Sequence, residues 1–435
     1  MKGYKFLIPV FIIVLYAGSI YTLYSQREKL EKEYNGCLSA ARTYREQEIF
    51  VDAEAQYMQA LELKPSVELY VEIGEMYEET EQRQKLEKWG DEILSEYPEE
   101  IEGYDFMMKI YMKKNDYVSC FGIYDTVNSR KLSSPYINEQ IDEIKYKYYM
   151  SGEYEDVKIY NEDMCLVRNS DKWGYVNTMG SRSVSLSYIK AGPFSGGLAP
   201  VVDIKGDAYY IDTAGNKKFV LTGVDNVCEL TNAENNVLGV YNGESWGFYN
   251  PSGEWLFGEY DDVSSISTGV IAVEKDGFWN VIDIAGNLLS EDEYYEIAMD
   301  ENRMVYRNDR LFVRTDKKYY MADNTGRRIG EYEYDNADLF KDNTLAAVEI
   351  DGKWGFTDKD GNIKIEPVYD KARSFSNGFA AVEIDGKWGF IDMDNNIVIE
   401  PEFDGAKDFN SNGCAYVYDR TEEVWRLLIL YSYHH

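Results

Sequence analysis

Histidine is the side chain that most often serves both acid–base catalysis and metal binding, and this chain has two histidines. They are His434 and His435, side by side at the end of the sequence. A Ser-His-Asp triad needs a histidine held inside the fold, between a nucleophile and a carboxylate. The sequence therefore argues against such a triad, and against a catalytic metal held by histidines within the fold.

Carboxylates are abundant, and one run of them is similar to a calcium-binding loop. It reads Asp-Lys-Asp-Gly-Asn over residues 358–362, and residues 392–394 echo it. A full EF-hand loop needs further ligands at fixed positions and flanking helices, whereas strands are predicted here, so a plain hairpin turn is favoured. Among so many acids no pair stands out as a general acid–base couple, and no G-x-x-x-x-G-K-[ST] phosphate loop is present. We predict no catalytic, cofactor-binding or metal-binding residue and no cofactor.

The five cysteines are scattered along the chain without a C-x-x-C pair. Their number and spacing fit neither a disulfide framework nor a zinc site. Cys37, Cys120, Cys165 and Cys414 each fall on an apolar repeat position, which predicts small core residues.

Tryptophan marks a repeat in the last two thirds of the chain. Clear copies centre on Trp173, Trp246, Trp354 and Trp388, and degenerate copies place Ala208, Trp279, Tyr319 and Trp425 at the same point. Successive spacings are 35, 38, 33, 40, 35, 34 and 37 residues, which gives eight units. A fixed period of this length predicts a solenoid, a propeller or an array, in which neighbouring units bury each other's apolar faces. A structural role for the tryptophan is favoured over a sugar-binding or peptide-binding surface.

Each unit has the pattern of three antiparallel strands. In the best copy, apolar residues 379–382 precede Asp385-Gly386, residues 387–392 follow, and a second turn at 394–396 leads into residues 397–399. Asp-Gly between alternating apolar runs predicts a type I′ hairpin, because both central residues need positive φ.

The motif DGKWGFIDxxGxxVIxPxYDxAxxFxxGxAxV resembles the bacterial WG repeat (KWG repeat) family over residues 153–435. The resemblance implies a β-rich repeat module without catalytic residues. Eight three-stranded units favour a β-propeller, which leaves only short sheet edges. An open linear or spiral stack of β-meanders is the alternative.

Between residues 34 and 135 the apolar period changes to three and four, which predicts helices. Starting at Tyr34, the tetratricopeptide positions hold Ala41, Tyr44, Ala53, Tyr57, Ala60 and Pro65. Starts at Val67 and Ile101 give poorer copies, so the stretch resembles tetratricopeptide repeats. Residues 137–150 are predicted to form a further, capping helix.

Residues 6–24 carry no charge and are followed by a densely charged segment, residues 26–33. A helix of about 20 apolar residues spans a bilayer, so we expect a transmembrane anchor, with a cleaved signal peptide as the alternative. We expect a single-pass membrane protein with the bulk of the chain outside the cytoplasm, although the positive-inside rule opposes this orientation.

The net charge of −33 is concentrated in residues 151–435, which hold 27 basic and 51 acidic side chains. Such a surface repels phosphate backbones, so no nucleic-acid partner is expected.

We therefore predict a multidomain α + β protein: a transmembrane anchor (1–25), a charged juxtamembrane segment (26–33), tetratricopeptide-like helices (34–152) and a WG-repeat β domain (153–435). The predicted function is a non-catalytic scaffold that binds a protein, a peptide or a cell-surface polymer. The alternative is a head that binds or acts on glycans, with acidic residues at the mouth of a propeller. A cluster of unpaired carboxylates in a central pocket would favour the alternative.

Overall fold

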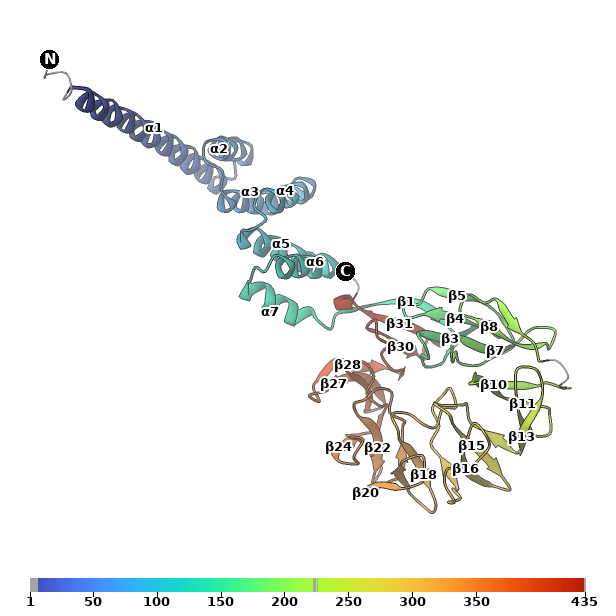
Figure 1. Ribbon diagram of the computed structural model, residues 1–435. Helices are drawn as coiled ribbons and strands as arrows, with labels where there is room; N and C mark the ends of the chain where they lie inside the picture. Colours follow the sequence, from blue (N-terminus) through green and yellow to red (C-terminus); the bar gives the residue numbers. More distant parts are fainter. Residues whose placement is uncertain (1–6, 222–223, 225, 434–435) are drawn as a thin grey trace. The chain divides into compact units, whose positions relative to one another are not determined.

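The computed structural model describes residues 7–221, 224 and 226–433, with side chains from Tyr21 onward. The chain divides into two compact units (Figure 1). The first unit is helical and ends at Lys145, and the second is β-rich and begins at Tyr146.

Seven helices make up the described part of the first unit: α1 (Leu7–Glu46), α2 (Phe50–Leu63), α3 (Val67–Glu79), α4 (Arg83–Glu96), α5 (Ile101–Lys114), α6 (Tyr117–Ser129) and α7 (Pro135–Ile144). Three of them begin at a side-chain cap, which satisfies backbone N–H groups of the first turn. Ser66 accepts from the Leu69 N–H, Asp116 from the Ser119 N–H and Ser134 from the Ile137 N–H. Consecutive helices pack in pairs, α1 with α2, α3 with α4 and α5 with α6.

The predicted membrane anchor is not supported. Among the residues that the structure describes, no helix is both long and apolar enough to cross a membrane. This finding corrects the predicted transmembrane helix and the single-pass membrane localisation. Helix α1 instead runs without a break from Leu7 through the charged segment 26–33 to Glu46. Residues 1–6 lie outside the described residues.

The predicted capping helix over residues 137–150 is too long. Helix α7 ends at Ile144, and strand β1 (Tyr148–Tyr154) begins four residues later. The residues Tyr148, Tyr149 and Met150 fit the spacing of either element, and pairing with another strand decides between them.

The second unit consists of eight antiparallel sheets, the blades of a β-propeller, which follow one another around a ring in Figure 1. Blades 1 and 2 comprise, respectively, β2 (Asp156–Val157), β3 (Met164–Asn169), β4 (Lys172–Asn177) and β5 (Arg182–Tyr188), and β6 (Lys190–Ala191), β7 (Leu198–Val202), β8 (Ala208–Asp212) and β9 (Lys217–Phe219). Blade 3 comprises β10 (Glu229–Glu234), β11 (Val237–Tyr241), β12 (Trp246–Tyr249) and β13 (Trp255–Tyr260). Blade 4 comprises β14 (Asp262–Val263), β15 (Val270–Lys275) and β16 (Phe278–Asp283).

Blades 5 and 6 comprise, respectively, β17 (Glu296–Ile297), β18 (Leu311–Arg314), β19 (Tyr319–Ala322) and β20 (Arg328–Tyr334), and β21 (Asn336–Ala337), β22 (Ala346–Ile350), β23 (Lys353–Thr357) and β24 (Ile363–Tyr369). Blade 7 comprises β25 (Lys371–Ala372), β26 (Phe379–Ile384), β27 (Lys387–Asp392) and β28 (Ile397–Phe403). Blade 8 comprises β29 (Gly405–Ala406), β30 (Cys414–Asp419) and β31 (Val424–Leu430) together with β1. A short 3₁₀ helix, Tyr431–Tyr433, follows β31.

The ring is closed by strand β1, which comes from the beginning of the unit and joins its last blade. Tyr148 pairs with Leu430 and Ser151 with Leu427, antiparallel to β31. Blade 8 thus contains three strands from the end of the chain and one from the start of the propeller. Of the two predicted architectures, the closed propeller is correct and the open stack is not.

The apolar core lies between the blades. Eight hydrophobic clusters each combine residues of two successive blades, and the cluster that joins blade 8 to blade 1 contains Val157, Val167, Tyr416 and Leu427. Trp173, Trp246, Trp279, Trp354, Trp388 and Trp425 all pack, half-buried, against these clusters. This packing supports the structural role predicted for the repeated tryptophan.

The prediction of three strands per unit is wrong for seven of the eight blades, which have four. The additional strand is the innermost one, and in most blades it has only two residues, such as Lys371–Ala372. A strand this short has no visible sequence period, so the pattern could not predict it. The Asp-Gly turns are as predicted, because Asp385 and Gly386 have φ values of +52° and +78°.

The glycine after Trp354 and after Trp388 is needed because another strand passes close to it. A Cβ built on Gly389 would lie 2.5 Å from the Ile399 carbonyl oxygen, and one on Gly355 would lie 2.5 Å from that of Ile365. These contacts are with backbone atoms of the outermost strand, which cannot rotate away. Only glycine lets the outermost strand approach so closely.

We expect Gly389→Ala to lower the free energy of unfolding by about 2–3 kcal/mol, because β28 has to move away from β27. Gly386→Ala in the same blade is the control: it meets nothing within 4 Å, but it places alanine at φ +78°. Its cost should be smaller, about 1–2 kcal/mol. Chemical denaturation of the full chain measures both, and equal losses would contradict the close-approach argument.

We also expect β1 to be essential for the closed ring. A chain starting at residue 146 retains β1, and a chain starting at residue 155 lacks it. The shorter chain should unfold at a lower temperature and associate through the exposed edge of β31, because an unpaired sheet edge recruits other strands. Thermal unfolding and light scattering test this. Equal melting temperatures would mean that closure does not depend on β1.

Candidate functional site at the propeller axis

The axis of the propeller is lined by the segments that come after the innermost strands. The Asn302 side chain of blade 5 donates to the Ile159 carbonyl of blade 1 (3.3 Å). Arg307 of blade 5 donates to the Asn161 side chain of blade 1 (3.0 Å). Blades 1 and 5 are not neighbours, so these contacts place the segments at the centre of the ring.

Blade 5 contributes an unusually long segment. Thirteen residues, 298–310, separate β17 from β18, whereas six, 373–378, separate the corresponding strands of blade 7. The additional residues form a turn in which the Arg303 N–H donates to the Asp300 carbonyl (2.9 Å). Ser265 of blade 4 holds this turn by donating from its hydroxyl to the Asn302 carbonyl (2.8 Å).

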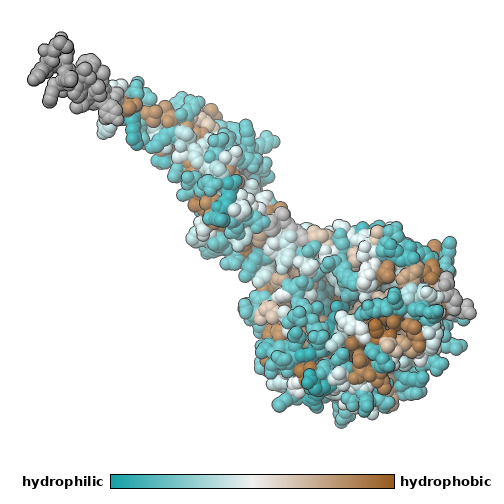
Figure 2. Space-filling view, in the orientation of Figure 1, coloured by the Kyte–Doolittle hydropathy of each residue, from teal (hydrophilic) through white to brown (hydrophobic). Residues whose placement is uncertain are grey.

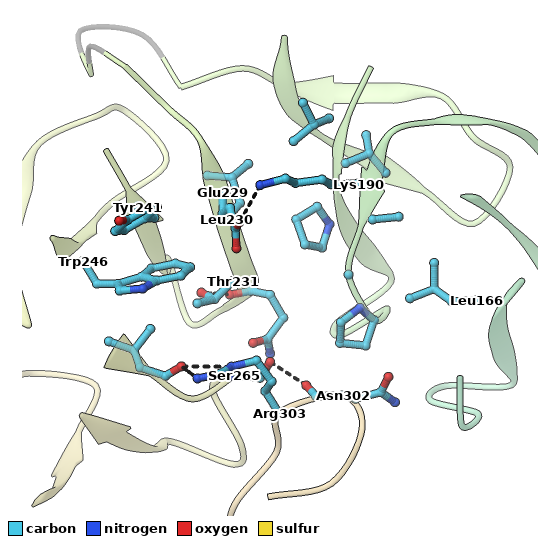
Figure 3. Close-up of a pocket in the computed structure, with 18 of the residues that line it drawn as sticks. Leu166, Lys190, Glu229, Leu230, Thr231, Tyr241, Trp246, Ser265, Asn302 and Arg303 are labelled. Atoms are coloured by element: carbon cyan, nitrogen blue, oxygen red, sulfur yellow. Dashed lines mark hydrogen bonds and ion pairs between the residues drawn. The ribbon is translucent and has the colours of Figure 1, made fainter. Parts of the chain in front are cut away.

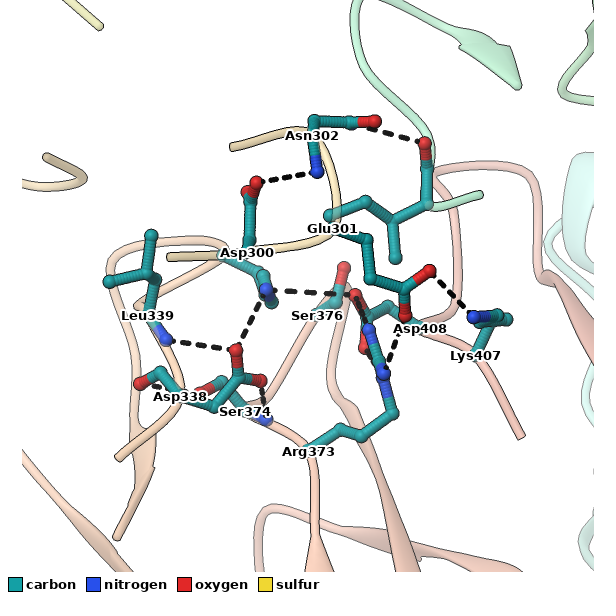
Figure 4. Close-up of polar contacts among 12 residues, drawn as sticks. Asp300, Glu301, Asn302, Asp338, Leu339, Arg373, Ser374, Ser376, Lys407 and Asp408 are labelled. Carbon is teal, nitrogen blue, oxygen red and sulfur yellow. Dashed lines mark hydrogen bonds and ion pairs between the residues drawn. The ribbon is translucent and has the colours of Figure 1, made fainter. Parts of the chain in front are cut away.

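Glu301, at the tip of this turn, connects three blades (Figure 4). Arg373 of blade 7 donates to its Oε1 at 3.0 Å, and Lys407 of blade 8 donates to its Oε2 at 2.6 Å. All three side chains are largely buried. Burial opposes the charged form, but Arg373 and Lys407 outweigh it and hold the pKa of Glu301 below its usual range.

Asp408 extends the same network. It accepts from Arg373 at 2.6 Å, and Lys341 lies 4.0 Å away while also pairing with Asp338 at 3.0 Å. Burial would raise the pKa of Asp408, but Arg373 and Lys341 keep it below the usual value. We call Glu301, Arg373, Lys407, Asp408 and Lys341 the axial ion network. Together with Asp338, the partner of Lys341, it sets three cations against three carboxylates, so it suits holding blades together better than moving protons.

A cavity of about 350 Å³ lies beside the axial ion network (Figure 3). Residues of blades 2, 3 and 4 form most of its wall, among them Pro193, Pro200, Leu230, Tyr241, Trp246 and Val263. The rings of Tyr241 and Trp246 lie 5.4 Å apart and both are half-buried. A volume of this size suits a few side chains or a small ligand.

Four carboxylates line this cavity, and three of them are paired with cations. Glu229 pairs with Lys190 across blades 2 and 3, Asp262 pairs with Arg303 (2.7 Å), and Glu301 belongs to the axial ion network. The fourth, Asp261, accepts only the backbone N–H of Asp276 (2.8 Å) among the described residues. The cavity therefore offers one carboxylate without a cation partner.

Two further cavities are present in the described part of the chain. One, of about 260 Å³, is lined by Tyr160, Arg307, Lys341, Asp408 and Asn410 and so adjoins the axial ion network. The other, of about 530 Å³, lies in the helical unit among α3, α4 and α5. The cavity of the helical unit has one aromatic residue in its wall, Tyr77, and the 260 Å³ cavity has two, Tyr160 and Phe409, as many as the cavity at Trp246.

Asp358 and the buried cysteines, which the sequence analysis singled out, have structural roles in the fold. Asp358 accepts the backbone N–H groups of Asp360 and Asn362 at 2.9 Å and closes a hairpin, as the plain-turn interpretation expects. None of the five cysteines, all of which lie in the described residues, forms a disulfide; Cys120, Cys165 and Cys414 are buried as predicted, but Cys37 is only partly buried. His434 and His435 lie outside the described residues.

The axial ion network was not predicted. Its one sequence signal is the 40-residue spacing from Trp279 to Tyr319, the longest in the array, which reflects the insertion in blade 5. Charges at Arg373 and Lys407, directly after the innermost strands, carry no signal by themselves in so charged a chain.

Comparison with protein families agrees with the repeat. The family model "WG containing repeat" matches residues 173–203, 246–279, 323–354, 354–388 and 388–418. The segments between these matches include Ala208 and Tyr319, where the tryptophan is replaced. These matches support a WG repeat protein, and the repeats between residues 173 and 418 build most of an eight-bladed β-propeller. They do not extend to the helical unit, so the tetratricopeptide resemblance is not confirmed.

Comparison with solved structures finds distant similarity. BamB from Moraxella catarrhalis is 11% identical, with 65% of this chain and 100% of that chain covered and a TM-score of 0.42. A eukaryotic initiation factor is 13% identical, with 70% and 90% covered and a TM-score of 0.43. Kluyveromyces lactis Hsv2 is 10% identical, with 65% and 98% covered and a TM-score of 0.34. Comparison with curated proteins gave no match.

We expect Glu301→Gln to lower the free energy of unfolding by about 3–5 kcal/mol at neutral pH, because it leaves the buried Lys407 without a counter-charge. The pKa of Glu301 is lowered in the folded state, so its stabilisation is present above the ordinary value of 4.5 and is lost as the pH falls through the folded-state pKa. The deficit of the variant should therefore shrink below about pH 4.5.

Thermal unfolding between pH 3 and pH 8 measures this difference. Glu400→Gln is the control, because Glu400 is an exposed glutamate on β28 with no partner among the described residues. A deficit for Glu301→Gln that does not change with pH would show that the side chain acts through packing and not through its charge.

Proposed function

We propose that this protein is a non-catalytic interaction scaffold whose propeller binds a segment of a partner protein at the cavity beside Trp246. The observation that carries the proposal is the cavity itself. The closed ring presents Tyr241 and Trp246, half-buried and next to an apolar wall that includes Pro193 and Pro200. Aromatic side chains that line a pocket and keep part of their surface exposed are typical anchors for a partner.

Catalysis on glycans is the less favoured function. Hydrolysis of a glycosidic bond generally uses two carboxyl groups, one as acid and one as base or nucleophile. Three of the four carboxylates at the cavity are held by cations, which leaves Asp261 without a second such group. The aromatic pair would also suit a sugar ring, so glycan binding is the outcome against which the scaffold must be tested.

We further propose that residues 34–135 form tetratricopeptide-like hairpins that present a second surface to partners. The small residues of the pattern lie where helices approach closely. Ala41, Ala53 and Ala60 have no exposed surface. A Cβ on Gly74 would lie 2.6 Å from the Phe106 ring, and one on Gly90 would lie 2.5 Å from Met107. The helix lengths and pairing fit such repeats.

The scaffold proposal predicts a specific polypeptide contact at the cavity. A photo-crosslinking amino acid is placed at Lys190, on the cavity wall, or at Lys364, an exposed lysine of blade 6. Both lysines are about half-exposed and each forms one ion pair, so the two replacements disturb the protein similarly. We expect a discrete protein adduct at position 190 that excess unlabelled protein suppresses, and none at position 364.

A different pair of results would contradict the scaffold proposal. If position 190 gives no suppressible protein adduct while the purified chain binds or cleaves a glycan, the scaffold proposal is wrong and the glycan function replaces it.

A further inference from the structure

A repeated ion pair joins neighbouring blades at three junctions. The lysine before the tryptophan position of one blade pairs with an aspartate at the start of the next: Lys318 with Asp335 (3.0 Å), Lys353 with Asp370 (2.6 Å) and Lys387 with Asp404 (3.0 Å). In each case the lysine binds Oδ1 of the aspartate. Oδ2 accepts a backbone N–H from the hairpin of the next blade, at 2.7, 2.8 and 3.0 Å respectively.

Asp261, between blades 3 and 4, has one half of this arrangement. Its Oδ2 accepts the Asp276 N–H at 2.8 Å, as in the other three junctions. The residue before Trp246 is Ser245 instead of lysine, so no lysine reaches Oδ1. Among the described residues no other cation pairs with Asp261, and the nearby Lys190 and Arg303 pair with Glu229 and Asp262.

At the four remaining junctions the aspartate itself is replaced, by Glu155, Ile189, Cys228 and Tyr295, whose backbone N–H groups make the same contact with the next blade. Ile189 and Tyr295 take its place after Tyr188 and Tyr294. The Tyr295 ring instead lies 5.4 Å from Phe278, the residue before Trp279. Of these four, Glu155 alone is a carboxylate without the repeat lysine, because Val424 precedes Trp425, and Glu155 is not among the residues that line the 350 Å³ cavity. At Asp261 the carboxylate remains although its cation is missing, and it lines the 350 Å³ cavity.

The surroundings of Asp261 suit a long cationic side chain. The residue paired with Trp246 across the strands is Tyr241, whereas Trp354 and Trp388 face Glu349 and Glu383. An aromatic pair therefore lies beside an unneutralised carboxylate (Figure 3 shows the two rings). Aromatic faces attract ammonium and guanidinium groups, and an apolar wall accommodates their methylene stems.

The charge of the whole protein favours the same ligand. The net charge is −33, and hydrophilic side chains cover most of the visible face of the propeller in Figure 2. A strongly acidic surface raises the local concentration and the association rate of a basic partner.

We propose that the cavity binds a lysine or arginine side chain of a partner polypeptide, whose cation takes the position that the repeat lysine occupies at the other junctions. This proposal rests on the proposed function and specifies the chemistry of its ligand. The bound cation would pair with Asp261 Oδ1 and lie against Trp246 and Tyr241.

The test restores the missing lysine in the protein's own chain. Ser245→Lys rebuilds the arrangement of the other junctions and should fill the site from within. Ser252→Lys, in an exposed turn of the same blade, adds the same charge elsewhere and is the matched control. Asp261→Asn removes the carboxylate. The probes are blocked Gly-Lys-Gly, Gly-Arg-Gly and Gly-norleucine-Gly peptides, titrated into the full-length protein and followed through its tryptophan indole NMR signals.

We expect saturable binding of the lysine and arginine peptides, weakened by salt, and binding of the norleucine peptide at least about tenfold weaker. Ser245→Lys and Asp261→Asn should each weaken lysine-peptide binding at least about tenfold, and Ser252→Lys by less than about twofold. Ser245→Lys should not lower the melting temperature, because the same ion pair is formed at three other junctions.

Equal binding of the norleucine peptide, or equal losses in Ser245→Lys and Ser252→Lys, would overturn the proposal. The two proposals fail separately. If no cationic peptide binds but the adduct at position 190 persists, the scaffold stands and the cationic ligand is wrong. If the adduct is also absent, both fail.

Discussion

The structure depends on the fact that no blade can bury its own apolar faces. Each hydrophobic cluster of the propeller takes its residues from two successive blades, so each blade is stable only against its neighbours on both sides. A row of such blades would end in two exposed apolar faces. Closing the ring removes both ends at once, and the cluster that contains Val157, Cys414 and Leu427 does so. Strand β1 then covers the outer edge of the last blade.

Closure brings the innermost strands together at the axis, where side chains have little room. In most blades these strands are two residues long, and the segment after each of them must either stop short of the axis or share it. The insertion in blade 5 occupies this space. The carboxylate of Glu301, at its tip, pairs with Arg373 and Lys407 from two other blades. A buried ion cluster is weak evidence for added stability, because desolvation offsets much of the attraction. It does fix which segments meet, since a wrong partner would leave a charge unpaired.

The repeat period and the residues of the turns determined how much of the fold and of the site could be predicted from the sequence. Trp354, Trp388 and the Asp-Gly turns give the blades, their number and their approximate bounds, because both signals are local and recur in register. The innermost strands escaped prediction because two residues show no period, and the switch from α7 to β1 depends on pairing with residues about 280 positions away. The axial ion network escaped because its members become neighbours only when the ring closes. In the sequence, Asp261 is one acid among many. Its missing lysine partner is recognised only by comparison with the junctions at which the ion pair is formed.

That contrast shows how a site can arise in a repeat protein. Identical blades offer identical junctions, and a junction in which every charge is paired has nothing left to offer a ligand. Loss of both members of the pair, as at Phe278 and Tyr295, leaves packing in its place. Loss of only the cation, as at Ser245, leaves Asp261 without an ion pair on the wall of a cavity. An exposed carboxylate remains solvated in the free protein, so retaining it costs little stability. Its use then depends on which cation a partner brings to it.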